Sequence, residues 1–127
     1  MDINGFQLDS LFTRYKEIKL VYLFGSQATK KTTSLSDYDF AVYLDPKTTI
    51  NRKKEIILIL ITEISVILKT NNIDLLVLNN AMFPLLKFNI LKEGVLIYQQ
   101  PPYKILVEPA IYNEYFDFKI FSQIHNQ

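Results

Sequence analysis

The chain has 127 residues with a formal net charge of +1, 49% apolar residues, one histidine and no cysteine. A chain of this length buries about two thirds of its unfolded surface, so it can hold a hydrophobic core without disulfides. The lack of cysteine excludes thiolate zinc sites, cysteine nucleophiles and a disulfide framework. The nearly neutral charge argues against direct binding of nucleic acid, which normally requires a basic surface.

The three glycines, at positions 5, 25 and 94, are too far apart for a Walker A loop or a dinucleotide-binding turn, which need several glycines in one loop. Any phosphate site must therefore use a single glycine. The longest apolar run, residues 56–61, is far shorter than the roughly 20 residues of a membrane span, and the N-terminus does not resemble a secretory signal. We expect one domain over residues 1–127, in the cytoplasm and without a membrane partner.

In chain order, hydrophobic periodicity and turn residues predict alternating helices and strands. Helices are expected over 6–17, within the polar segment 27–36, and over 52–70, 81–91 and 108–123; strands are expected over 19–24, 37–45, 73–78 and 95–98. In the second strand Phe40, Val42 and Leu44 share one face, whereas the third is so apolar that burial on both faces is expected. Pro84 falls in the first turn of its helix, where a missing N–H costs least. The order predicts an α/β (α+β) fold with a small mixed β-sheet flanked by helices.

Two apolar segments leave alternatives open. The run 56–61 goes right round a helix, which indicates either a core helix covered by the C-terminal segment, the interpretation we favour, or a partly exposed helix that contacts a partner. The aromatic residues of the last helix are expected to pack in the core, with contact to a partner protein or a second copy as another use. These residues are Tyr112, Tyr115, Phe116 and Phe118. The basic residues Arg14, Arg52, Lys53 and Lys54 are expected to be solvated.

The residues that carry chemistry lie across the first two strands. Gly25 and Ser26 end the first strand, and ten residues later Asp37, Tyr38 and Asp39 begin the second. Because residues two apart in a strand share a face, Asp37 and Asp39 should point the same way. Two adjacent carboxylates repel one another unless a cation lies between them, and an all-oxygen site suits Mg²⁺ with substrate phosphates as further ligands. The pattern predicts a site for phosphate-transfer chemistry.

A third carboxylate, Asp74, stands in the apolar third strand, where an unpaired buried charge would be costly. If that strand lies beside the second, Asp74 joins the metal site. Gly25 lets the backbone approach a triphosphate, and the Ser26 hydroxyl and the following N–H groups can donate to it. The structural alternative makes Gly25 a turn residue, Ser26 a helix cap, and the aspartates exposed loop, edge or capping residues.

These residues resemble the GSx10DxD motif of the nucleotidyltransferase fold shared by DNA polymerase beta, aminoglycoside nucleotidyltransferases and minimal nucleotidyltransferase (MNT) proteins. The chain is too short for the multi-domain relatives and resembles an MNT-domain antitoxin of the MntA kind, the partner of a HEPN-domain toxin. The resemblance covers most of the chain and includes Asp74 at the place of the family's third carboxylate. It implies the polymerase beta-like palm fold. Many members carry an arginine soon after the serine, whereas here Lys30 or Lys31 would supply the positive charge.

The resemblance implies transfer of AMP from ATP to a hydroxyl, with a tyrosine of a HEPN toxin as acceptor. Asp37, Asp39 and Asp74 would hold two Mg²⁺ ions about 4 Å apart, and Asp74 would also act as general base. Gly25, Ser26 and Lys30 would bind the nucleotide phosphates. Two alternatives stay open: an antitoxin that neutralises its partner by stoichiometric binding with weak catalysis, and a nucleotidyltransferase acting on a small molecule. Homo-oligomers and hetero-complexes are both compatible with the sequence.

Overall fold

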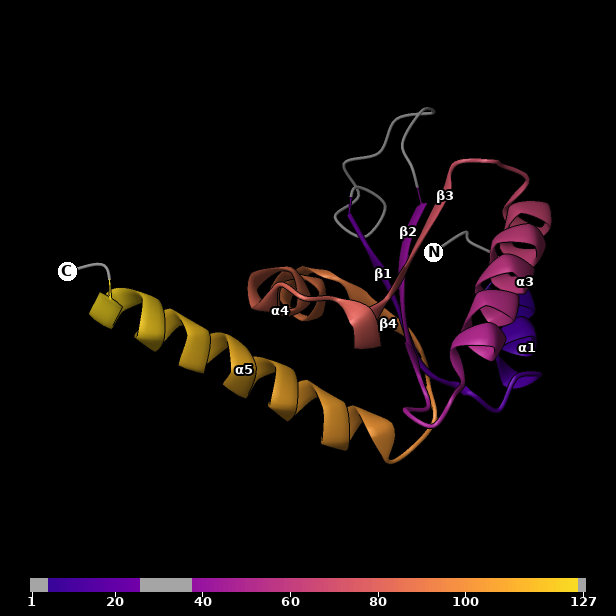
Figure 1. Ribbon diagram of the computed structural model, residues 1–127. Coiled ribbons are helices and arrows are strands. Elements are labelled where there is room, and N and C mark those ends of the chain that lie inside the picture. Colours follow the sequence, from indigo (N-terminus) through magenta and orange to yellow (C-terminus); the bar gives the residue numbers. More distant parts are fainter. Residues whose placement is uncertain (1–4, 26–37, 126–127) are drawn as a thin grey trace.

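The computed structural model describes residues 5–25 and 38–125, in which four helices flank a four-stranded mixed sheet (Figure 1). The strands are β1 (Ile18–Phe24), β2 (Tyr38–Leu44), β3 (Ile73–Val77) and β4 (Val95–Gln99), and their order in the sheet is β3-β2-β1-β4. β1 runs antiparallel to β2 and β4, whereas β2 and β3 are parallel. The predicted α/β (α+β) class and mixed sheet are confirmed. The short helix expected within 27–36 lies outside the described residues.

Two helices cover each face of the sheet. The helices α1 (Gly5–Thr13) and α3 (Ile50–Leu68) lie on one face, and α4 (Pro84–Glu93) and α5 (Tyr103–His125) lie on the other (Figure 1). A short 3₁₀ helix, η1 (Leu78–Asn80), connects β3 to the segment before α4. None of the helices in the described ranges combines the length and the apolar character needed to cross a membrane.

The strand side chains alternate between two apolar cores. Phe40, Val42 and Leu44 are buried with α1 and α3, which confirms their predicted common face. Ala41 packs with α4 and α5, so β2 is buried on both sides. β3 is only partly buried because it forms an edge of the sheet, and the expectation of burial on both faces is therefore wrong.

The helices differ from the predictions mainly in their ends and in what covers them. Pro84 occupies the first turn of α4, as predicted. α5 begins at Tyr103, five residues before the expected start, and Pro109 lies inside the helix. Tyr22 of β1 donates a hydrogen bond of 2.6 Å from its hydroxyl to the Glu108 carboxylate, which fastens these early turns to the sheet. The favoured core position of α3 is correct for the side that faces the sheet, where Ile56 and Leu60 are buried, but Leu58 on its outer side is exposed. α1 packs beside α3 on the same face, and the C-terminal segment that was expected to cover it lies across the opposite face.

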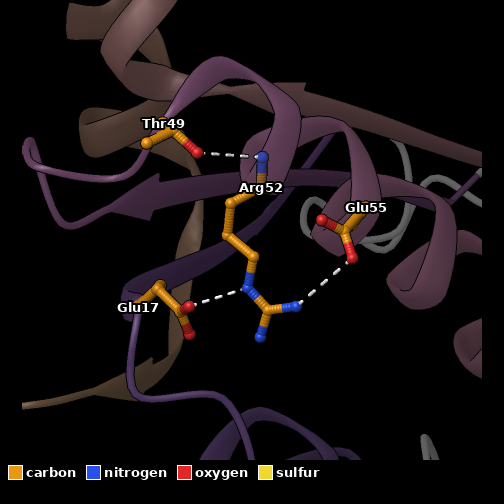
Figure 2. Close-up of polar contacts among 4 residues, drawn as sticks. All are labelled: Glu17, Thr49, Arg52 and Glu55. Atoms are coloured by element: carbon orange, nitrogen blue, oxygen red, sulfur yellow. Dashed lines mark hydrogen bonds and ion pairs between the residues drawn. The ribbon is translucent and has the colours of Figure 1, made fainter.

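Arg52, which the sequence predicts to be solvated, keeps 36% of its side chain exposed and also forms an ion pair (Figure 2). Its Nε donates a 2.7 Å hydrogen bond to Oε2 of Glu17, in the turn before β1, and its Nη1 lies 3.8 Å from Oε2 of Glu55. Its backbone N–H donates to the Thr49 hydroxyl, which caps α3. The hydrogen bond from Arg52 lowers the pKa of Glu17 and raises the pKa of Arg52. The pair therefore joins the start of α3 to the start of β1.

Replacing Glu17 by glutamine should lower the free energy of unfolding at pH 7 by about 1 kcal/mol, because the partly buried ion pair loses its charge. The folded-state pKa of Glu17 lies below the ordinary value of 4.5, so the stabilisation exists above that value. It disappears as pH falls through the lower folded-state pKa. Urea denaturation at pH 7 and pH 3 should give a difference between wild type and Glu17→Gln that shrinks in acid. Glu55→Gln, at the exposed end of the same network, should have a smaller effect; an equal loss for Glu17→Gln at both pH values would contradict the assignment.

Candidate functional site

Three segments of the chain meet at one end of the sheet. β1 ends at Phe24, which is opposite Asp39 of β2, and Gly25 follows. In the parallel pairing of β2 and β3, Asp39 is the register partner of Asp74. Neighbouring strands lie about 4.8 Å apart, so the backbones of the two aspartates are adjacent. The third strand therefore lies beside the second, which is the condition under which the sequence places Asp74 at the predicted site.

Hydrogen bonds at both ends of the β2–β3 pair hold this register. At the end near the aspartates, the Tyr38 N–H donates a 2.8 Å hydrogen bond to the Asn72 carbonyl. At the other end, the side-chain amide of Asn79 donates to the Leu44 carbonyl at 2.7 Å and accepts from the Leu44 N–H at 2.9 Å. A shift of one residue would move Asp74 to the opposite face, so these contacts fix which side chains meet.

Both aspartates face the side of the sheet that α4 and α5 cover. Residues two apart in a strand share a face, and Ala41 and Leu76, two residues after the aspartates, pack in the core with α4 and α5. The intervening residues Phe40 and Leu75 pack on the α1 and α3 side. Asp39 and Asp74 therefore present two carboxylates on the same face, one half-buried and the other exposed.

Gly25 makes room for the carboxylate of Asp39. Its φ is +76°, a left-handed conformation that favours glycine. A Cβ at this position would overlap Oδ2 of Asp39 and lie 3.2 Å from its Cγ. The backbone at the end of β1 and the acidic side chain of β2 are therefore in direct contact. The sequence analysis assigned Gly25 to the approach of a phosphate. It did not predict that Gly25 must also leave room for Asp39, because Asp39 lies fourteen positions further along the chain.

The exposure of Asp74 differs from the sequence expectation. The apolar run around it predicts a buried charge, but β3 is an edge strand and Asp74 is exposed to solvent. The alternative that Asp74 is an exposed residue of an edge strand is therefore correct. The register of β2 and β3 nevertheless places Asp74 beside Asp39. Like charges on neighbouring strands destabilise the pair unless a cation lies nearby. Carboxylate oxygens are the ligands that Mg²⁺ prefers, so this pair fits a divalent cation.

The remaining predicted site residues, Ser26, Lys30 and Asp37, lie outside the described residues, as does the alternative Lys31. Within residues 5–25 and 38–125, no cluster of three or more acidic, histidine or cysteine side chains has the arrangement of a metal site. The described part of the site therefore consists of Gly25, Asp39 and Asp74.

A separate cavity of about 480 Å³ lies on the same face, at the other end of β2, and its lining includes Tyr43, Asp45, Lys87 and Tyr103 but neither Asp39 nor Asp74. Burial is the main cause of the raised pKa of Tyr43. No local sequence pattern predicts this cavity, because its lining comes from four separate segments.

The chain matches the family model described as Polymerase beta, Nucleotidyltransferase over residues 7–103. Among solved structures, a toxin-antitoxin crystal structure with AMP-PNP has a TM-score of 0.75 at 20% identity, with 95% of this chain and 94% of that chain covered. A tri-AMPylated HEPN toxin in complex with MNT antitoxin from Shewanella oneidensis gives 0.67 at 20% identity, with 95% and 91% covered. The toxin-antitoxin MntA-HepT gives 0.68 at 18% identity, with 98% and 94% covered.

No curated protein matches the chain in sequence. At identities of 18–20% the similar structures establish the fold, which is the predicted polymerase beta-like one. The family model covers about three quarters of the chain, from α1 to the start of α5. The chain therefore belongs to the polymerase beta nucleotidyltransferase family.

Proposed function

We propose that this nucleotidyltransferase transfers AMP from ATP to a tyrosine hydroxyl of a HEPN-domain toxin and thereby acts as its antitoxin. The observation that carries the proposal is the register pairing of Asp39 with Asp74 beside Gly25. Two similar structures support the choice of nucleotide and acceptor, one with AMP-PNP and one with an AMPylated HEPN toxin. We place the reaction in the cytoplasm and assign it to one minimal domain of residues 1–127.

In the proposed reaction, the acceptor oxygen attacks the α-phosphorus of ATP. The bond from that phosphorus to the oxygen that bridges to the β-phosphate breaks, and pyrophosphate leaves. Asp74 takes the proton of the incoming hydroxyl, a role that suits its exposed carboxylate. Gly25, Ser26 and Lys30 are assigned to the β- and γ-phosphates.

Asp37, Asp39 and Asp74 are the residues that would hold Mg²⁺, with two ions expected. When bound, the metal neutralises charge on the phosphate oxygens and favours in-line displacement. Asp39 is half-buried and its carboxylate lies close to Gly25, which leaves less space in which the carboxylate can turn. A positioned carboxylate is what metal and substrate alignment require.

The proposal is tested by incubating the purified chain with a purified HEPN-domain toxin, Mg²⁺, and ATP labelled on either the α- or the γ-phosphate. The toxin should acquire the α-label, and unlabelled pyrophosphate should appear in equal amount. Removal of Mg²⁺ with EDTA should stop the labelling, and added Mg²⁺ should restore it. Transfer of the γ-label, or labelling that persists in EDTA, would contradict the proposed reaction.

Neutralisation by binding alone is a second candidate, because many large apolar side chains of α4 and α5 are exposed. The Asp37→Asn/Asp39→Asn double variant separates the two functions. If catalysis is the antitoxin activity, this variant should fail to rescue cells that express the toxin. Rescue at equal expression would favour binding.

A further inference from the structure

We propose that an exposed apolar surface on α4 and α5 is where the protein acceptor docks, an inference that rests on the proposed function. We call it the apolar docking surface. It combines the start of α4 with the end of α5. Its members are Met82, Phe83, Leu85, Leu86, Phe116, Phe118, Ile120, Phe121 and Ile124.

A groove joins the two parts of this surface. It has a volume of about 760 Å³, and its lining includes Met82, Phe83, Leu86 and Phe118. All of its lining side chains are apolar except the amide of Asn89. Exposed apolar patches of this kind usually mark protein-protein contact sites. The groove can receive an apolar side chain of a partner, as the central pockets of such interfaces do.

The end of α5 has no covering layer among the described residues. Figure 1 shows this part of the helix extending beyond the rest of the fold. The earlier turns are held by Phe88 of α4, whose ring stacks on Tyr115 with a centroid distance of 4.1 Å. Beyond them Phe121 and Ile124 are 59% and 62% exposed. The aromatic residues of this helix were expected to pack in the core. This prediction is wrong for Phe116 and Phe118, which are exposed.

Charged residues border the surface, as in the polar rim of a protein interface. Lys87 and Glu114 form an ion pair of 2.6 Å between α4 and α5. Asp117 and Lys119 are exposed on the last turns of α5. The charges balance, so the apolar contacts would supply most of the affinity.

The position of this surface favours the acceptor protein over a second copy of the chain. The acceptor must reach Asp39 and Asp74, and these aspartates face the side of the sheet on which α4 and α5 lie. A toxin that buries Phe83 and Phe118 is then held on the side where its tyrosine must approach. The outer side of α3 also has exposed apolar residues, Leu58 and Val66, but it lies on the opposite face.

The test measures the affinity of the chain for the purified HEPN-domain toxin used in the transfer assay above. Two docking variants, Phe83→Ser/Phe118→Ser and Phe121→Ser/Ile124→Ser, remove exposed apolar contacts without touching the core. Leu58→Ser/Val66→Ser is the matched control, with residues that are 68% and 70% exposed. We expect at least one docking variant to weaken binding about tenfold or more, while the control changes it less than twofold. Affinity for AMP-PNP should be unchanged in all three.

The outcomes separate the docking surface from the proposed function. Wild-type affinity in both docking variants would overturn the inference and leave the reaction intact. Tight binding of the toxin by the wild type without AMP transfer would overturn the proposed reaction. The docking surface would then still be tested by the toxin affinities of the docking variants. A wild-type dimer that becomes monomeric in the docking variants, with toxin binding unchanged, would assign the surface to a second copy and overturn the inference. No toxin binding by the wild type would overturn both.

Discussion

Replacing Asp39 by asparagine should reduce the rate of AMP transfer to the toxin by at least about 10³-fold. Asparagine keeps the shape of the side chain but removes the negative charge that a metal-nucleotide complex requires. Loss of a single preorganised electrostatic contact commonly costs about 10²–10³-fold in rate, and a metal ligand should cost no less. Single-turnover transfer of α-labelled AMP is the appropriate measurement, because it isolates the chemical step from product release.

The same variant should remain within about 1 kcal/mol of wild type in its free energy of unfolding, since one of two like charges on neighbouring strands is removed. Asp45→Asn is the matched control. It follows the other end of β2, and its Oδ1 accepts a hydrogen bond from the Lys47 N–H that asparagine can also accept. Transfer by the control should stay within about twofold of wild type. Full activity in Asp39→Asn, or an equal loss in Asp45→Asn, would contradict the role assigned to Asp39.

Replacing Gly25 by alanine should impair both stability and transfer. The positive φ of Gly25 is strained for alanine, at a cost of about 1–3 kcal/mol. In addition, the new Cβ would push the carboxylate of Asp39 from its position. A displacement of about 1 Å in an active site can reduce the rate about 10²-fold, so a loss of that size is expected. Gly5→Ala is the control, because a Cβ there meets nothing within 4 Å.

A double-mutant cycle distinguishes the contact with Asp39 from backbone strain. In an Asp39→Ala background the overlapping carboxylate is absent, so Gly25→Ala should reduce the free energy of unfolding less than it does in wild type. Urea denaturation of the four proteins gives the coupling energy. If Gly25→Ala lowers the free energy of unfolding equally in both backgrounds, the glycine is required only for its backbone conformation.

The fold was largely predictable because its strands carry strong local signals. Alternation in β2 and the turn at Gly25 predicted the first two strands, and the apolar run of α3 predicted a core helix. What could not be predicted were features that depend on the order of strands. The apolar sequence of β3 is the same at an edge as at the centre of a sheet, so the exposure of Asp74 follows only from the observed order. Likewise, nothing local in α5 tells which of its aromatic residues meet Phe88 and which extend past α4.

The site was predictable in its membership more than in its contacts. The spacing along the chain singled out Gly25 and Asp39 as candidates, and the place of Asp74 in an apolar strand added the third; the structure brings the three together. The contact of Gly25 with Asp39 and the ion pair of Arg52 with Glu17 join residues far apart in the sequence. Such contacts arise from tertiary packing, which residue periodicity does not encode.

The most direct test is a crystal structure of the chain with Mg²⁺ and AMP-PNP. We expect a metal ion bound by Asp39 and Asp74, with the phosphates of the nucleotide beside Gly25. A nucleotide bound elsewhere, for example in the cavity lined by Tyr43 and Tyr103, with no metal at the aspartate pair, would contradict it.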